Sequence, residues 1–219
     1  MNPGGARREI RGVLALLVDV WVDPGIAFRT VLEGPLRWAT VLIPWLLFVG
    51  VASIDLLVRS GGQSDWRGPL IFDSDPEGFR AYLRSMGVIS LIVGSAIALV
   101  LNSLLLWGLG RFLARNPVRF LDALRIMGLS LAVPILGGVA TLLLVQSAGD
   151  LDAQFSLGYL LGIGGSGLVE MPLLAATNLF HLWYLVVIAV GLSVLTDLSG
   201  RICFGICGIF WIMPKLLAF

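Results

Sequence analysis

Few side chains in this sequence could carry out covalent chemistry. Ser166 lies in a Gly-Ser-Gly sequence ahead of His181, and a serine beside a histidine can form a nucleophile and its base. However, His181 is set in the bulky run Leu-Phe-His-Leu-Trp, and Ser166 is followed by Glu170 and Pro172 instead of a continuous apolar helix. We therefore expect Ser166 to belong to a loop, and intramembrane hydrolysis is the least favoured of three functions considered below.

Other catalytic and metal-binding patterns are absent from the sequence. It contains no H-E-x-x-H sequence, no phosphate-binding loop with its lysine and no G-x-S-x-G sequence. The two cysteines, Cys203 and Cys207, are four residues apart in an apolar segment and have no further thiol or histidine nearby to complete a zinc site. We expect them to be small packing residues on one helix face, and we expect no enzyme activity, no metal and no cofactor.

Three neutral polar residues are the candidates for binding. Asn102, Asn178 and His181 all lie within strongly apolar segments. Polar groups at membrane depth are costly and often functional, so each could contact a substrate, an ion or a proton. Each could equally be a hydrogen-bonding contact between helices. The sequence leaves both interpretations open.

Composition places these residues in a membrane protein. Of the 219 residues, 58% are apolar and 13% are charged, and the mean hydropathy is +0.94. Soluble domains carry roughly 25% charged residues, so too few charges remain here to cover a surface that faces water. The net charge of +1 gives no basis for binding nucleic acid or an acidic substrate. We expect membrane lipids to surround most of the chain.

The apolar segments predict an all-α integral membrane bundle of about five transmembrane helices. Residues 36–219 form this domain, with spans at about 38–58, 86–109, 126–148, 173–196 and 202–217. A span of about 20 residues covers the roughly 30 Å of the hydrocarbon core. Pro44 in the first span and Pro134 with Gly137-Gly138 in the third predict bends. The fifth span is the shortest.

Residues 1–35 are predicted to form a cytoplasmic or interfacial segment with two short helices. Residues 6–22 are amphipathic, with an apolar face formed by Ile10, Val13, Leu14, Leu17, Val20 and Trp21. Such a helix would lie in the membrane surface through Arg7, Arg8, Arg11 and Trp21, or else would pack on the bundle. Asp23-Pro24 is a helix-start signal, and the second helix is expected to stop at Gly34-Pro35.

Basic residues predict the orientation of the chain. Ten of them fall on the side of the N-terminus and five on the other side, which predicts a cytoplasmic N-terminus and an external C-terminus. Two ion pairs at i,i+4 spacing are also expected, Asp55–Arg59 and Asp197–Arg201. Fourteen of the fifteen basic residues are arginine, which favours a GC-rich bacterium as the source and hence its inner membrane.

The chain resembles the Yip family, named for Ypt-interacting proteins, over roughly residues 20–217. The similarity is carried by Val22–Phe28, which resembles the family's Pro-x-x-x-Phe motif, by Pro117–Arg125 running into Ala132-Val133-Pro134, and by Asn178–Trp183 with Val190-Gly191-Leu192. The resemblance implies an inside N-terminal segment followed by five spans. Eukaryotic members bind prenylated small GTPases and carry an acidic-Leu-Tyr-Gly-Pro motif before the first span. That motif is missing here, so we expect no small GTPase partner.

Bacterial members of this family resemble accessory subunits, some of them associated with exporters. The leading hypothesis is therefore a non-catalytic membrane scaffold or accessory subunit that binds another integral membrane protein through its lipid-facing helices. No charged pair occupies the middle of two spans, which argues against coupled transport. Permeation of a lipid or small solute is the second hypothesis. Small residues along the spans serve internal packing or partner helices equally well.

Overall fold

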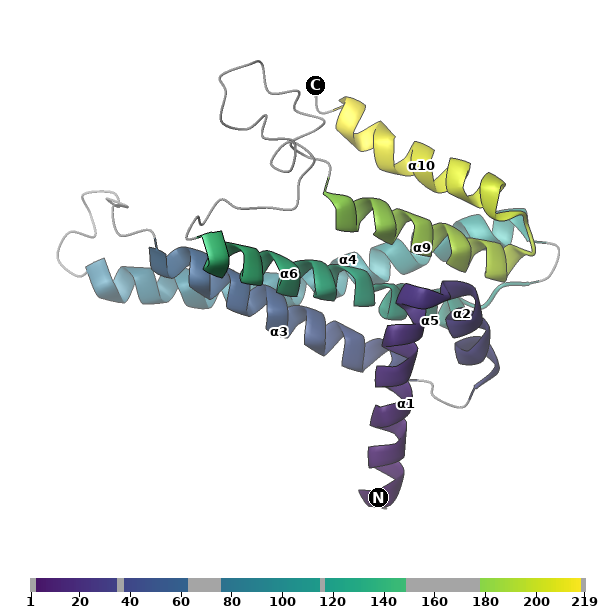
Figure 1. The fold of residues 1–219 in the computed structure, drawn as a ribbon. Helices are drawn as coiled ribbons and strands as arrows, with labels where there is room; N and C mark the ends of the chain where they lie inside the picture. The colour runs from purple at the N-terminus through teal and green to yellow at the C-terminus, as the bar shows by residue number, and fades with distance from the viewer. Residues whose placement is uncertain (1–2, 35–37, 63–75, 115–116, 149–177, 218–219) are drawn as a thin grey trace.

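The structure is a computed structural model that describes residues 3–34, 38–62, 76–114, 117–148 and 178–217. The described residues form eight α-helices, coloured along the chain in Figure 1. Their bounds are α1 Pro3–Val22, α2 Pro24–Glu33, α3 Ala39–Gly62, α4 Pro76–Leu113, α5 Phe120–Ser130, α6 Ala132–Ala148, α9 Leu179–Thr196 and α10 Gly200–Leu217.

The predicted all-helical membrane bundle is confirmed. Four segments are long and apolar enough to cross a membrane: Ala39–Arg59, Tyr82–Leu113, Phe120–Ser147 and Leu179–Thr196. Gly200–Phe210 of α10 is a shorter apolar helix, and residues 173–177 of the predicted fourth span lie outside the described part. Many large apolar side chains are exposed, for example Ile97 (54%) and Leu105 (58%) on α4. Lipid solvates such a surface, so the chain is a multi-pass integral membrane protein.

The long helices α3, α4, α6 and α9 run lengthwise through the bundle, and α10 lies at its edge against α9 (Figure 1). Helix α1 runs across the direction of these helices and contacts the bundle with its C-terminal half. Its buried positions are Val13, Leu16 and Val20, whereas Leu14 is 46% exposed. The predicted face was thus wrong at Leu14, because the turn of the helix that packs on the bundle places Leu16 inward instead.

Helix α2 begins and ends where the sequence predicts. Asp23 is the N-cap residue, and its carboxylate accepts a hydrogen bond from the backbone N–H of Ile26 at 3.0 Å. Pro24 occupies the first helical position, where its missing N–H costs nothing. Phe28 is fully buried between α5 and α9, because Gly191 on α9 lets the ring approach to within contact distance. Helix α2 is therefore docked in the bundle instead of lying free at its surface.

The third span is divided into α5 and α6 at Leu131, one turn before the bend predicted at Pro134. Pro134 has no N–H to donate to the carbonyl of Ser130, so the α-helical ladder is interrupted there. Pro44, in contrast, lies inside the uninterrupted helix α3.

Two predicted ion pairs have different outcomes. Asp55 and Arg59 form one at 3.0 Å on α3, as predicted. Asp197 and Arg201 form none in the described part of the chain, and this prediction was wrong. Helix α9 ends at Thr196 and α10 starts at Gly200, so the two residues do not share a helix face. Cys203 and Cys207 are free thiols buried in the core, which confirms their packing role.

Candidate functional site

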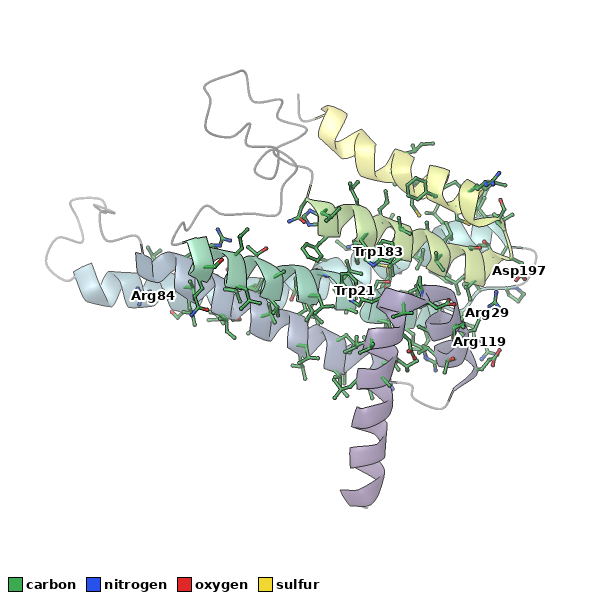
Figure 2. The ribbon with its side chains drawn as sticks, viewed as in Figure 1. Trp21, Arg29, Arg84, Arg119, Trp183 and Asp197 are labelled. Atoms are coloured by element: carbon green, nitrogen blue, oxygen red, sulfur yellow. The ribbon has the colours of Figure 1, made fainter. Side chains whose placement is uncertain are left out.

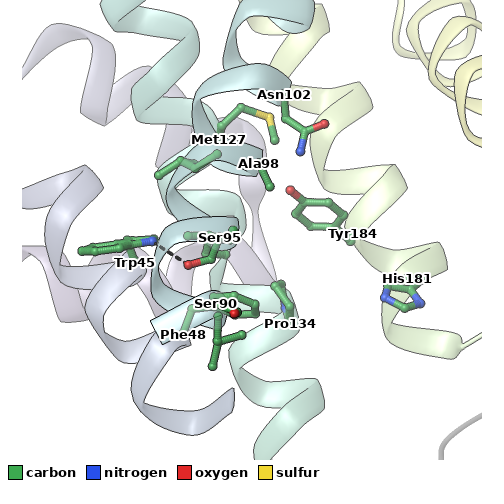
Figure 3. A pocket seen from close by; sticks show the side chains of 14 residues that line it. Trp45, Phe48, Ser90, Ser95, Ala98, Asn102, Met127, Pro134, His181 and Tyr184 are labelled. Carbon is green, nitrogen blue, oxygen red and sulfur yellow. Dashed lines mark hydrogen bonds between the residues drawn. The ribbon is translucent and has the colours of Figure 1, made fainter. Parts of the chain in front are cut away.

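A cavity of about 440 Å³ opens between the middle of α4 and the beginning of α9. Figure 3 shows its walls: Trp45 and Phe48 from α3, a row of small and polar residues from α4, and His181 and Tyr184 from α9. Met127, Leu131 and Pro134 close it from the α5–α6 side. The α4 residues Ser90 to Asn102 lie in the middle of the Tyr82–Leu113 candidate span, so this wall of the cavity belongs to a segment that is long and apolar enough to cross the membrane.

The α4 wall is a regular stripe. Ser90, Gly94, Ala98 and Asn102 recur every four residues, all four line the cavity, and all four are exposed. Because positions four apart lie on one helix face, they form a shallow track along α4. Nothing in the structure lies within 4 Å of the position that a Cβ at Gly94 would take. The track is therefore open towards the membrane.

Polar groups in the cavity are only partly satisfied. The indole N–H of Trp45 donates to the hydroxyl of Ser95 at 3.1 Å, and this hydroxyl donates in turn to the carbonyl of Ile92. Among the described residues, the Asn102 amide and the Tyr184 hydroxyl have no hydrogen-bond partner. Figure 3 shows that the Tyr184 hydroxyl points towards Asn102 across the cavity. Two neutral groups, each able to donate and accept, thus face a space at membrane depth.

The structure brings together two of the three binding residues proposed from sequence. Asn102 and His181 line the same cavity from opposite walls. Asn178 does not line it: its side chain is the N-cap of α9 and accepts a hydrogen bond from the backbone N–H of Phe180 at 2.8 Å. The cap accounts for this asparagine locally, because a helix start needs such an acceptor.

Of the four residues proposed to contact the membrane surface, the structure describes the side chain of Trp21 alone. The side chains of Arg7, Arg8 and Arg11 lie outside the described part of the structure. Trp21 packs on the bundle, where its indole stacks on Trp183 and its N–H donates to the carbonyl of Ala132 at 3.3 Å. Figure 2 shows Trp21 and Trp183 side by side in the middle of the molecule. Trp21 therefore fixes the end of α1 to the bundle.

Sequence reasoning missed Tyr184 and the stripe on α4. Tyr184 is three residues after His181, a spacing that places both on one helix face, so this signal was present. The four-residue repeat from Ser90 to Asn102 was also visible, but nothing in the sequence distinguished an open stripe from a packed one. The described residues that line the cavity include no Asp, Glu, Lys or Arg. In the described chain, no three His, Cys, Asp or Glu side chains are grouped to hold a metal ion.

Comparison with protein families identifies the chain. The family model described as the Yip1 domain matches residues 18–218. The chain belongs to the Yip1 domain family. The match covers α2 to α10 and the end of α1, so the cavity and the docked helix α2 both lie within this Yip1 domain. No curated protein and no solved structure matches the sequence.

Proposed function

We propose that this Yip1 domain is a non-catalytic accessory subunit that binds another integral membrane protein, and that a transmembrane helix of the partner lies along the α4 stripe. The observation that carries the proposal is the division of the glycines into two groups. Some of them contact neighbouring helices within the chain, and others face open space.

The first group of glycines is used for internal packing. A Cβ at Gly128 would lie 2.9 Å from the Cα of Val41, and a Cβ at Gly137 would lie 2.8 Å from the ring of Phe180. Substitution at such positions would force helices apart. These glycines serve packing within the bundle.

The second group has no such contact. A Cβ at any of these positions would meet nothing within 4 Å: Gly50, Gly94, Gly108, Gly200, Gly205 and Gly208. Glycine weakens a helix by about 1 kcal/mol relative to alanine, so a glycine that packs against nothing is unfavourable in the isolated chain. A partner helix that approaches closely would supply the missing contact. Gly94 is the member of this group that lies in the cavity.

Polar groups in the cavity support the same proposal. Lipid acyl chains offer no hydrogen bonds, so Asn102 and Tyr184 would stay unsatisfied against lipid alone. A neutral polar side chain on a partner helix would satisfy them, and such contacts between transmembrane helices contribute about 0.6–2 kcal/mol. The small residues of the α4 stripe would let the partner helix approach closely, and the polar groups would select which partner helix binds.

The proposal is tested by mild-detergent pull-down of the tagged chain from native membranes. Gly94→Leu fills the stripe, and we expect it to reduce the recovered partner at least fivefold. Gly50→Leu is the matched control, because Gly50 also faces open space but does not line the cavity. A chain that purifies without any stoichiometric partner, or equal recovery with both variants, would contradict the proposal.

The location of the protein is part of the same proposal. We place it in the cytoplasmic membrane of a bacterium, in association with an exporter, with the N-terminus inside and the C-terminus outside. The orientation is supported by the distribution of the basic residues, ten on the N-terminal side against five on the other. Thiol labelling of single cysteines added at each terminus of a cysteine-free variant in intact cells tests this orientation, and labelling of the N-terminal cysteine from outside would refute it.

The cavity also supports a second candidate, permeation of a lipid or small solute. Its support is the polar lining by Asn102 and Tyr184 at the depth of the hydrocarbon core. Flux of fluorescent lipid or solute into proteoliposomes decides between the two functions, and rates equal to those of protein-free liposomes would exclude permeation.

For hydrolysis we identify no support: Ser166 lies outside the described residues. Labelling by serine-reactive probes would reopen that alternative.

A further inference from the structure

A second cavity, of about 470 Å³, lies at the opposite end of α9, between α2 and the turn that follows Thr196. Arg29 and Glu33 from α2 line it on one side and Asp197 on the other. Figure 2 shows Arg29 and Asp197 at the same end of the molecule, far from Arg84. The remaining lining includes the apolar side chains of Leu32, Val194 and Leu198.

The charges around this cavity are not paired with one another. In the described part of the chain the ion pairs are Asp55–Arg59 and Asp122–Arg125, and none includes Arg29, Glu33 or Asp197. Arg29 and Glu33 are four residues apart on one helix, a spacing at which such pairs ordinarily form. One cation and two anions instead face a common space. A ligand that carries both signs of charge would complete these interactions.

The backbone adds negative potential on the same side. Helices α2 and α9 both end at this cavity, and helix C-termini carry partial negative charge. Asp197 has φ of 57°, the one positive φ among the described non-glycine residues. Its N–H donates to the carbonyl of Ser193 at 2.9 Å, and the hydroxyl of Ser193 donates to the carbonyl of Leu198 at 2.6 Å. These bonds hold the turn that presents the Asp197 carboxylate.

The position in the membrane indicates which ligand meets these charges. Asp197 directly follows the Leu179–Thr196 candidate span, so the cavity lies where the hydrocarbon core ends and lipid headgroups begin. The apolar side chains in the lining suit the upper part of the acyl chains. We propose that this cavity binds a phospholipid whose headgroup carries a phosphate and a primary ammonium, as phosphatidylethanolamine does. Arg29 binds the phosphate, and Asp197 and Glu33 bind the ammonium.

The same charges discriminate against other headgroups. An anionic glycerol headgroup offers the carboxylates and the helix C-termini no cation, so two anions stay uncompensated. A choline headgroup supplies a cation but no N–H donor for the carboxylates. The site therefore favours the primary amine over both. This inference is independent of the function proposed for the α4 stripe, because the two cavities share no residue.

The experiment uses the full chain in nanodiscs of equal parts phosphatidylethanolamine, phosphatidylcholine and phosphatidylglycerol. After extraction into detergent, native mass spectrometry counts the lipids that stay bound. We expect one retained phosphatidylethanolamine per chain. Arg29→Gln and Asp197→Asn should each reduce that retention about fivefold, the effect of losing one partly exposed charge contact. Asparagine tolerates a positive φ, so Asp197→Asn keeps the turn.

Matched controls are Arg111→Gln and Asp19→Asn, which remove exposed charges that do not line the cavity. They should retain the lipid as the wild type does. Equal retention of the three lipids, preference for phosphatidylglycerol, or unchanged retention in both cavity variants would overturn the proposal. Displacement of the lipid by millimolar glycerophosphoethanolamine would show that a soluble headgroup suffices, and would overturn the assignment to a membrane lipid.

Discussion

Replacing Gly128 by alanine should separate α3 from α5. The added Cβ would lie 2.9 Å from the Cα of Val41 and 3.1 Å from the carbonyl oxygen of Thr40. Carbon atoms in good contact are about 3.5–4.0 Å apart, so α3 would have to move by roughly 0.6–1 Å. Both neighbouring atoms belong to the backbone of a helix and cannot rotate away. We therefore expect a loss near the upper end of the range for overpacked cores, about 3 kcal/mol.

The protein provides its own reporter for this measurement. Cys203 and Cys207 are free and buried, so a fluorogenic thiol reagent reacts with them only on unfolding. For a chain of this size about 3 kcal/mol corresponds to a Tm lower by roughly 6–12 °C. Gly94→Ala is the control, since nothing lies within 4 Å of its added Cβ, and its Tm should be unchanged or slightly higher. Equal Tm values for wild type and Gly128→Ala would refute the close approach of α3 and α5.

Three further local interactions are probed by substitution, each measured by the same thermal unfolding assay. Asp23→Ala removes the acceptor at the start of α2 and should destabilise the protein by about 1 kcal/mol, whereas Asp23→Ser should restore most of that loss. A double-mutant cycle with Asp55→Asn and Arg59→Gln should give a coupling below about 1 kcal/mol, because both side chains are partly exposed; a larger value would place the pair in hydrocarbon. Trp45→Phe removes the hydrogen bond to Ser95 and should cost about 0.5–1.5 kcal/mol, and no loss at all would show that this bond is absent.

Local chemistry explains what the sequence could predict. The start of α2 depends on Asp23 and Pro24, which act within four residues, and the membrane character depends on composition and run length. The ion pair on α3 is likewise a contact between neighbours on one helix. Asp197 and Arg201 have the same spacing, but α9 ends before Asp197 and α10 begins between the two residues, so the rule that holds within a helix does not apply.

Tertiary contacts explain what the sequence could not predict. Gly94 and Gly128 look alike in sequence, yet one faces open space and the other touches the backbone of α3. The difference arises from how α4 and α5 are placed, which no local pattern records. The two cavities could not be predicted for the same reason, since each is bounded by helices far apart in the chain. Asn102 could be named as a candidate from its type alone, whereas the spacing of Tyr184 from His181 gains its meaning only once the structure shows that both line one cavity.

The docking of α2 has a consequence for the order of biogenesis. Phe28 packs beside Gly191, and the buried guanidinium of Arg125 donates to the carbonyl of Val31 at 3.4 Å. The ribosome makes Phe28 more than 160 residues before Gly191, an interval of roughly 10–30 s at ordinary elongation rates. During that time the surface of α9 against which Phe28 packs does not yet exist. The packing site for α2 forms only when α9, the last of the four long helices, has entered the bilayer. Docking of α2 is therefore a late step of assembly, although α2 is made early.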